Sequence, residues 1–212
     1  MSRMKKLLLP FGCALLVLAG CSDTGTSTTA VAKKEPEKAP DPVAGQSAIY
    51  KMYQVARSWA PDAQVLKLNS IPLSEVPNVP HGKAAAWEAT FTSASRSQAR
   101  SYTYSIVEST GNLHKGVFAG PEQGFSGPRG VTAPFPIMAV KIETDAAYET
   151  ALKNGGADYD KKNPGKPISF LLEKQNKYPD PVWRVIWGES IGTSNFSVII
   201  DASTGEYKEK LH

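Results

Sequence analysis

The chain has 212 residues, a formal net charge of +4 and an apolar fraction of 41%. This length allows one large domain or two small ones. The small net charge excludes the electrostatic footprint of a nucleic-acid-binding protein, and two cysteines are too few for a disulfide-rich fold.

Residues 1–20 are predicted to be a signal peptide. Arg3, Lys5 and Lys6 form a positive n-region. Residues 7–18 form an apolar run that is too short for a membrane-spanning helix, which needs about 20 residues. Because this segment holds three of the 24 basic residues and none of the 20 acidic ones, its removal leaves a net charge of +1.

Residues 18–21 read Leu-Ala-Gly-Cys and resemble the lipobox of bacterial lipoproteins, where a small residue precedes a lipidated cysteine. The resemblance implies cleavage before Cys21 and attachment of acyl chains, palmitate among them, to that residue. Cys13 leaves with the signal peptide, so no thiol is expected to remain for a disulfide, a nucleophile or a metal. Ser22 after the cysteine predicts an outer-membrane address facing the periplasm, if the organism has two membranes.

The segment 21–45 is predicted to be a lipidated, disordered tether, because it is rich in Thr, Ser, Ala, Lys, Glu and Pro and has no apolar periodicity. A helix is predicted next, with Ser47 as its N-cap and Pro61 as its end. Alternating apolar and polar residues then predict strands at 64–71, 87–92 and 101–106, a turn at 109–112 and a short strand at 113–118.

The second half of the chain repeats this order. Residues 119–135 contain four glycines and three prolines, which predicts a long loop. Thr144 is expected to cap a second helix that ends at Gly155 and Gly156. The strands that follow are predicted at 168–173, 183–187, 196–200 and 206–211, with a Ser-Thr-Gly turn at 203–205.

The two halves form an internal repeat, in which Trp87 and Trp183 occupy matching strands. Trp183-Arg184-Val185 and the later Asp201-Ala-Ser-Thr-Gly resemble PepSY-type modules, in which a helix precedes a Trp-x-Val strand and a strand ending in Val-Asp-x-x-Thr-Gly. The match covers roughly residues 143–210. It is weaker across 47–118, where Glu108 takes the place of Asp201.

This resemblance implies an α+β fold of two repeated modules, 46–130 and 131–212, each with one helix packed on an antiparallel meander. It also implies a small non-enzymatic module of bacterial envelope proteins, some of which restrain peptidases. The Asp-x-x-Thr-Gly motif is a structural signature, because Asp201 can accept hydrogen bonds in the turn and Gly205 tolerates a positive φ.

Gly188-Glu-Ser190-Ile-Gly192 matches the Gly-x-Ser-x-Gly elbow of serine hydrolases, and Asp201 and His212 follow in triad order. The elbow needs a helix directly after the serine, whereas residues 193–201 alternate as a strand. We therefore expect a hairpin loop and no enzyme, and a serine hydrolase using Ser190 remains a minor alternative.

Other side chains indicate packing or solvation rather than chemistry. Three isolated histidines predict no metal site, and no phosphate-binding loop or other cofactor motif is present. Among the tryptophans only Trp187 is expected to be partly exposed. The histidines His81, His114 and His212 are expected to be surface residues. A mildly basic region is expected to be a solvated face, with a surface for an acidic partner as the weaker alternative; it is formed by Lys161, Lys162, Lys166, Lys174 and Lys177.

The leading hypothesis is a membrane-anchored, non-catalytic lipoprotein of the cell envelope that acts as a binding or regulatory module. Its expected contacts are the membrane, through the lipid on Cys21, and a protein or peptide partner such as a peptidase; no nucleic acid is expected. The alternative is a structural or assembly accessory of the envelope.

Overall fold

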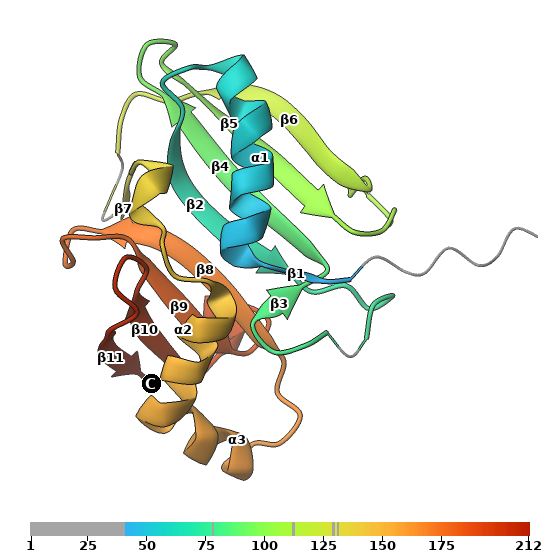
Figure 1. Ribbon diagram of the computed structural model, residues 1–212, viewed down its shortest axis with the longest axis vertical. Helices are drawn as coiled ribbons and strands as arrows, with labels where there is room; N and C mark the ends of the chain where they lie inside the picture. Colours follow the sequence, from blue (N-terminus) through green and yellow to red (C-terminus); the bar gives the residue numbers. More distant parts are fainter. Residues whose placement is uncertain (1–40, 78, 112, 129, 131) are drawn as a thin grey trace, which may run out of the picture. The chain divides into compact units, whose positions relative to one another are not determined.

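Nine antiparallel strands form one sheet with the order β11-β10-β9-β8-β2-β4-β5-β6, and β7 pairs with β8 (Figure 1). The computed structural model describes residues 41–212 except 78, 112, 129 and 131. The predicted signal peptide, Cys21 and the part of the predicted tether before residue 41 therefore lie outside the described residues. The elements are β1 (Val43–Ala44), α1 (Gly45–Trp59), β2 (Gln64–Ile71), β3 (Lys83–Ala84), β4 (Ala86–Ser93), β5 (Gln98–Ser105), β6 (Gly116–Gly124), β7 (Thr132–Ala133), α2 (Thr144–Ala151), α3 (Ala157–Lys162), β8 (Ile168–Gln175), β9 (Val182–Trp187), β10 (Ser197–Asp201) and β11 (Tyr207–Leu211), with 3-10 turns at Ile137–Ala139 and Ile191–Thr193.

Each half of the sheet follows a helix. The strands β2, β4, β5 and β6 come after α1, those from β8 to β11 come after α2, and the halves join through β2 and β8. Both helices cover the same face of the sheet (Figure 1). The predicted α+β class is therefore confirmed as a large antiparallel sheet with one main helix. That helix, α1, has 15 residues, and no helix among the described residues is long and apolar enough to cross a membrane.

The core lies between the sheet and the helices. Period-two alternation places Trp87 and Phe91 of β4, and Trp183 and Trp187 of β9, on the face toward the helices, where all four side chains are fully buried. One cluster contains residues of both halves. The described residues from 41 onward belong to one compact unit with its own hydrophobic core, which is the property expected of a segment that folds independently.

The folded part begins earlier than the sequence predicted. Val43 and Ala44 pair with β3, and α1 begins at Gly45, so these residues do not belong to a tether. Ser47 is not the N-cap; it lies in the first turn, and its N–H and hydroxyl both donate to the Glu143 carboxylate. The cap of α1 therefore comes from a residue about 97 positions away, which local sequence patterns cannot reveal.

The second helix also differs from the prediction. Its N-cap is Glu143 rather than Thr144, and the chain does not end its helical course at Gly155 and Gly156. Gly155 takes a φ of 109°, which kinks the backbone, and α3 continues beyond it. This continuation covers Trp187, which is fully buried and not partly exposed as predicted.

The stretch 119–135 is not one long loop. Strand β6 starts only at Gly116 and extends to Gly124, so it runs through the first part of this stretch, and β7 follows at Thr132–Ala133. Pairing with β5 forms β6 despite Pro121, because a proline is tolerated on an edge strand, where no neighbour needs its N–H.

The strand register corrects one part of the repeat alignment. Ser105 pairs with Ala86 next to Trp87, and Asp201 pairs with Val182 next to Trp183, so Ser105 is the counterpart of Asp201. Glu108 is not the counterpart of Asp201. It is exposed and accepts hydrogen bonds from the His114 ring and the Lys115 N–H.

Candidate binding site

The contact between the two halves of the sheet is short. Strands β2 and β8 pair only from Lys67 to Asn69 on β2 and from Leu171 to Glu173 on β8. We call this contact the β2–β8 seam. Beyond it, β2 stays paired with β4 at both ends, whereas β8 stays paired with β9 only toward Ile168 and pairs with β7 past Glu173. The sheet therefore divides at both ends of the seam.

One end of the seam is filled by the chain itself, and we call it the closed end. Thr132 and Ala133 pair with the end of β8, and Phe135 pairs with Val65 of β2. Both backbone hydrogen bonds of the last pair are made, at 2.9 and 2.8 Å. An extended segment thus satisfies backbone groups of both diverging strands.

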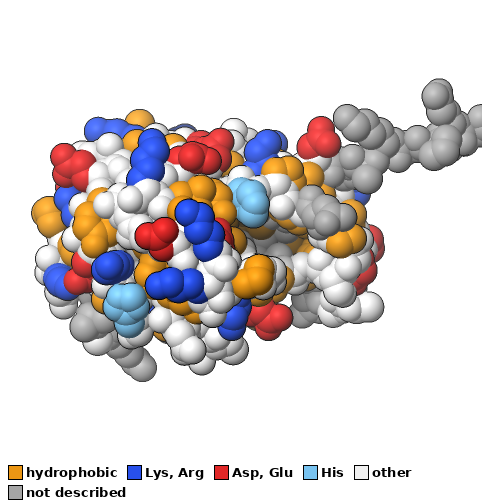
Figure 2. All heavy atoms as spheres, turned by 90° about the horizontal axis from the view of Figure 1, so that it is seen from below, with side chains coloured by type: hydrophobic (Ala, Val, Ile, Leu, Met, Phe, Trp, Pro, Cys, Tyr) orange, Lys and Arg blue, Asp and Glu red, His pale blue; other side chains and the backbone are white. Residues whose placement is uncertain are grey.

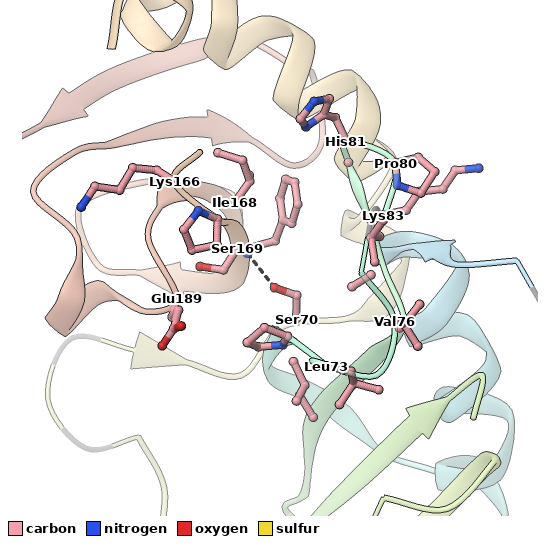
Figure 3. Close-up of a pocket in the computed structure, with 18 of the residues that line it drawn as sticks. Ser70, Leu73, Val76, Pro80, His81, Lys83, Lys166, Ile168, Ser169 and Glu189 are labelled. Carbon is pink, nitrogen blue, oxygen red and sulfur yellow. Dashed lines mark hydrogen bonds between the residues drawn. The ribbon is translucent and has the colours of Figure 1, made fainter. Parts of the chain in front are cut away.

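The other end, the open end, contains a cavity of about 440 Å³. The Phe170 N–H of β8 donates to the Ser70 hydroxyl at 2.9 Å (Figure 3). At this position a side chain of β2, rather than the β2 backbone, accepts the hydrogen bond from β8. The volume falls within the range typical of ligand pockets. The walls come from Ser70, Ile71, Pro72, Leu73, Val76, Val79, Pro80, His81, Gly82, Lys83, Ala84, Ala85, Gly165, Lys166, Pro167, Ile168, Ser169, Phe170 and Glu189.

Apolar side chains line most of this cavity, and charged ones stand at its rim. Ile168, Leu73 and Val76 line the space, whereas Lys83 and Lys166 extend outward on opposite sides in Figure 3. Such a pocket binds mainly by apolar contact and uses a few polar groups for orientation.

The wall opposite β8 is held by two other elements. The Thr144 hydroxyl at the start of α2 donates to the Gly82 carbonyl, and β3 pairs with β1. A Cβ on Gly82 would collide with the Asp145 backbone, so the close approach of this wall to α2 requires glycine. The His81 ring stacks on Tyr148 with 4.9 Å between centroids. These contacts fix the cavity shape.

The backbone of β8 presents one side to the cavity. The Pro167 carbonyl accepts the Gly188 N–H at 2.7 Å, on the side of β9. Because strand backbone groups alternate in direction, Ile168 and Phe170 direct theirs to the opposite side, toward the open end. The Phe170 hydrogen bond to Ser70 confirms this direction.

The residues of the predicted hydrolase motif serve other contacts. Ser190 is exposed and caps the 3-10 turn, where its hydroxyl lies 3.2 Å from that of Thr193. Asp201 is buried; one carboxylate oxygen accepts the Ser203 and Thr204 N–H groups and the other pairs with Lys208 at 3.1 Å.

The environments of Asp201 and His212 also differ from those of a catalytic triad. Burial raises the pKa of Asp201, but the hydrogen bonds outweigh it and hold the pKa below the ordinary value. The His212 ring lies against Phe196 at 5.6 Å between centroids. Gly205 takes a φ of 82°, as the turn prediction expects.

The predicted basic region is interrupted by acidic partners. Lys161 lies 3.9 Å from Asp158, and Lys177 lies 2.6 Å from Glu209. Figure 2 shows one face of the molecule on which basic and acidic side chains are interspersed. Pairs this exposed contribute little to stability, and their alternation leaves no extended basic surface on that face.

Sequence reasoning did not find the open end of the seam. Its walls come from positions about 100 residues apart, Ser70 and Phe170, which only strand pairing brings together. The one local signal is the density of Pro and Gly at residues 72–82 and 164–167, which indicates irregular backbone but not a cavity.

Comparisons with known proteins give little. No family model and no curated protein matches the chain. Among solved structures, a crystal structure from Clostridium difficile 630, described as that of a "putative lipoprotein", aligns with a TM-score of 0.48 and 8% sequence identity. The alignment covers 78% of this chain and 93% of that one.

Proposed function

We propose that this chain is a lipid-anchored, non-catalytic binding protein of the bacterial cell envelope, and that its ligand occupies the open end of the β2–β8 seam. The observation that carries the proposal is the cavity of about 440 Å³, lined mostly by apolar side chains and held by α2 and β1. A well-formed apolar pocket with few polar groups is suited to binding.

The two halves support a PepSY-like origin. In each half the tryptophan of the second long strand donates its indole N–H to the carbonyl two residues before the helix: Trp87 to Val43 at 3.1 Å, and Trp183 to Ile142 at 2.8 Å. A matching long-range contact in both halves is what duplication of one module predicts. The modules of this proposal therefore share one sheet, and the ligand site lies where they join.

The lipobox-like residues 18–21 support the anchor. Lipidation at Cys21 places the chain on the extracytoplasmic side, at the outer membrane facing the periplasm if the organism has two membranes. A peptidase or another envelope protein is the partner class that the PepSY resemblance favours.

The contacts of Ser190, Asp201 and His212 support a non-catalytic role. A triad needs a base within hydrogen-bond reach of the nucleophile and an acid that orients the base. Here the Asp201 carboxylate is used by the turn and by Lys208, and the His212 ring packs on Phe196.

The test is binding of N-phenylnaphthylamine, an uncharged apolar fluorophore, to residues 22–212, which leave out the lipidated cysteine so that no acyl chain competes. Val76→Trp is expected to fill the cavity and to weaken binding by about tenfold or more, because a side chain then occupies the probe's space. The matched control is Val55→Trp, at an exposed position of α1.

The proposal predicts saturable fluorescence with the unsubstituted chain and with Val55→Trp, and loss of it with Val76→Trp. Thermal unfolding of the unsubstituted chain and of both variants checks that all three proteins are folded. Absence of saturable binding, or equal binding by both tryptophan variants, would contradict a ligand site at the open end.

A further inference from the structure

Strands β2 and β8 separate at both ends of the β2–β8 seam, but only one of the two ends is filled by the chain itself. At the closed end, Thr132, Ala133 and Phe135 pair with both diverging strands. At the open end, the same two strands diverge around a cavity. An extended segment of this chain fills the gap between the strands at the closed end. The occupant that best matches the open end is therefore an extended segment from another molecule.

Strand β8 offers the backbone groups that such a segment needs. Ile168 directs its N–H and carbonyl to the cavity, because the neighbouring Pro167 carbonyl is used on the side of β9. Ile168 is half-buried and is the first residue of β8. A peptide can therefore pair with it by the strand addition that many peptide-binding domains use.

The outer edges of the sheet are poorer sites for strand addition. Strand β6 carries Pro121, which lacks an N–H, and β11 alternates charges at Lys208, Glu209 and Lys210. Prolines and charges on edge strands are known to block pairing with other chains. The edge of β8 at the open end carries neither feature between Ile168 and Phe170.

The rim adds a charge preference. Lys83 and Lys166 are both exposed, and neither forms an ion pair within the described part of the chain. Among the residues that line the cavity, Glu189 has the one carboxylate. Two lysines against one glutamate give a net positive rim, which is complementary to an acidic ligand.

We propose that the open end binds an extended acidic peptide, which pairs with the backbone of Ile168, places apolar side chains in the cavity and directs carboxylates toward Lys83 and Lys166. This inference rests on the proposed function and narrows its ligand class. It assigns specificity to three features: strand pairing, apolar side chains and negative charge.

The test is selection of binders to residues 22–212 from a displayed library of random seven-residue peptides, followed by affinity measurement on synthetic peptides. Ile168→Pro removes the N–H that the peptide uses and leaves the ladder with β9 intact, because a proline is tolerated as the first residue of a strand. We expect about tenfold weaker binding to it, and unchanged binding to Ile168→Val. The double variant Lys83→Ala/Lys166→Ala is expected to bind several-fold more weakly, with less dependence on salt.

A peptide N-methylated at the paired residue gives the same test without changing the protein, should Ile168→Pro fold poorly. The inference is supported if selected peptides are rich in Asp and Glu and lose affinity on N-methylation and with both protein variants. It is overturned if no peptide is selected, or if selected peptides bind the Ile168→Pro and lysine variants as they bind the original chain. If the inference is overturned but N-phenylnaphthylamine still binds saturably, the proposed function stands. If N-phenylnaphthylamine does not bind either, both the inference and the proposed function fail.

Discussion

The half of the molecule that follows α1 and the half that follows α2 use the same long-range contacts but different local chemistry. In both, a buried tryptophan donates to the carbonyl two residues before the helix. The helices, however, start with Gly45 in one half and Thr144 in the other, and the matching turn positions are Ser105 and Asp201. The long-range hydrogen bond of the tryptophan is thus common to both halves, whereas the residues at the helix starts and turns differ.

The start of α1 should be the most sensitive point of this comparison. A Cβ on Gly45 would lie 2.7 Å from Trp183 and 2.8 Å from Thr144, so Gly45→Thr, which copies the other half, overpacks the junction of the halves. We expect the free energy of unfolding to fall by about 3 kcal/mol, measured by urea denaturation. Gly124→Ala is the control, because nothing lies within 4 Å of a Cβ added at that position. If Gly45→Thr lowered the free energy of unfolding as little as Gly124→Ala, the close packing around Gly45 would be contradicted.

The buried tryptophans Trp87 and Trp183 should lose similar amounts of stability when each is replaced by phenylalanine. Trp87→Phe and Trp183→Phe each remove a buried hydrogen bond and leave a small cavity, so each should lower the free energy of unfolding by about 2 kcal/mol. The control is Trp59→Phe, since the Trp59 Nε1 has no hydrogen-bond partner within the described residues. If only one of the first two variants were destabilised, the halves would not be equivalent in construction.

Asp201 should give the second turn a pH dependence that the Ser105 hydroxyl, at the matching position, does not give the first. The pKa of Asp201 lies below its ordinary value of 3.8, so its contribution to stability is present above that value and is lost as the pH falls through the folded-state pKa. We expect Asp201→Asn to cost about 1.5 kcal/mol at pH 7 and to flatten the acid side of the stability curve. A variant with the original acid slope would show that Asp201 does not titrate as described.

The first turn should show a smaller effect. The Ser105 hydroxyl donates to the Val107 carbonyl at 2.6 Å and accepts the Val107 N–H at 3.2 Å. Ser105→Ala should therefore lower the free energy of unfolding by about 1 kcal/mol, equally at pH 4 and pH 7. Thermal unfolding at both pH values measures this, and a loss confined to one of them would be unexpected for a hydroxyl.

Local pattern was enough to predict most strands. The prediction at residues 64–71 coincides with β2, and the alternation around Trp87 and Trp183 identified β4 and β9 with their buried faces. These succeed because a strand with one buried face shows a period of two in its own sequence, independent of its neighbours.

The errors share one physical origin, which is a contact between residues far apart in the chain. Ser47 looked like a cap because the real acceptor, Glu143, belongs to the other half. Trp187 was expected to be partly exposed because it lies next to the loop at 188–194, whereas α3 covers it and Asp160 accepts the indole N–H at 2.5 Å. The binding site was missed for the same reason, since strand pairing alone brings its walls together.

The central claim, that a ligand adds to the open end of the β2–β8 seam, is tested most directly by hydrogen exchange at Ile168. The Leu172 amide, which lies within the seam on the same strand, is the internal reference. A bound selected peptide is predicted to slow exchange at Ile168 by about tenfold or more and to leave Leu172 unchanged. Protection that appears at β6 or β11 instead, with Ile168 unaffected, would contradict the account.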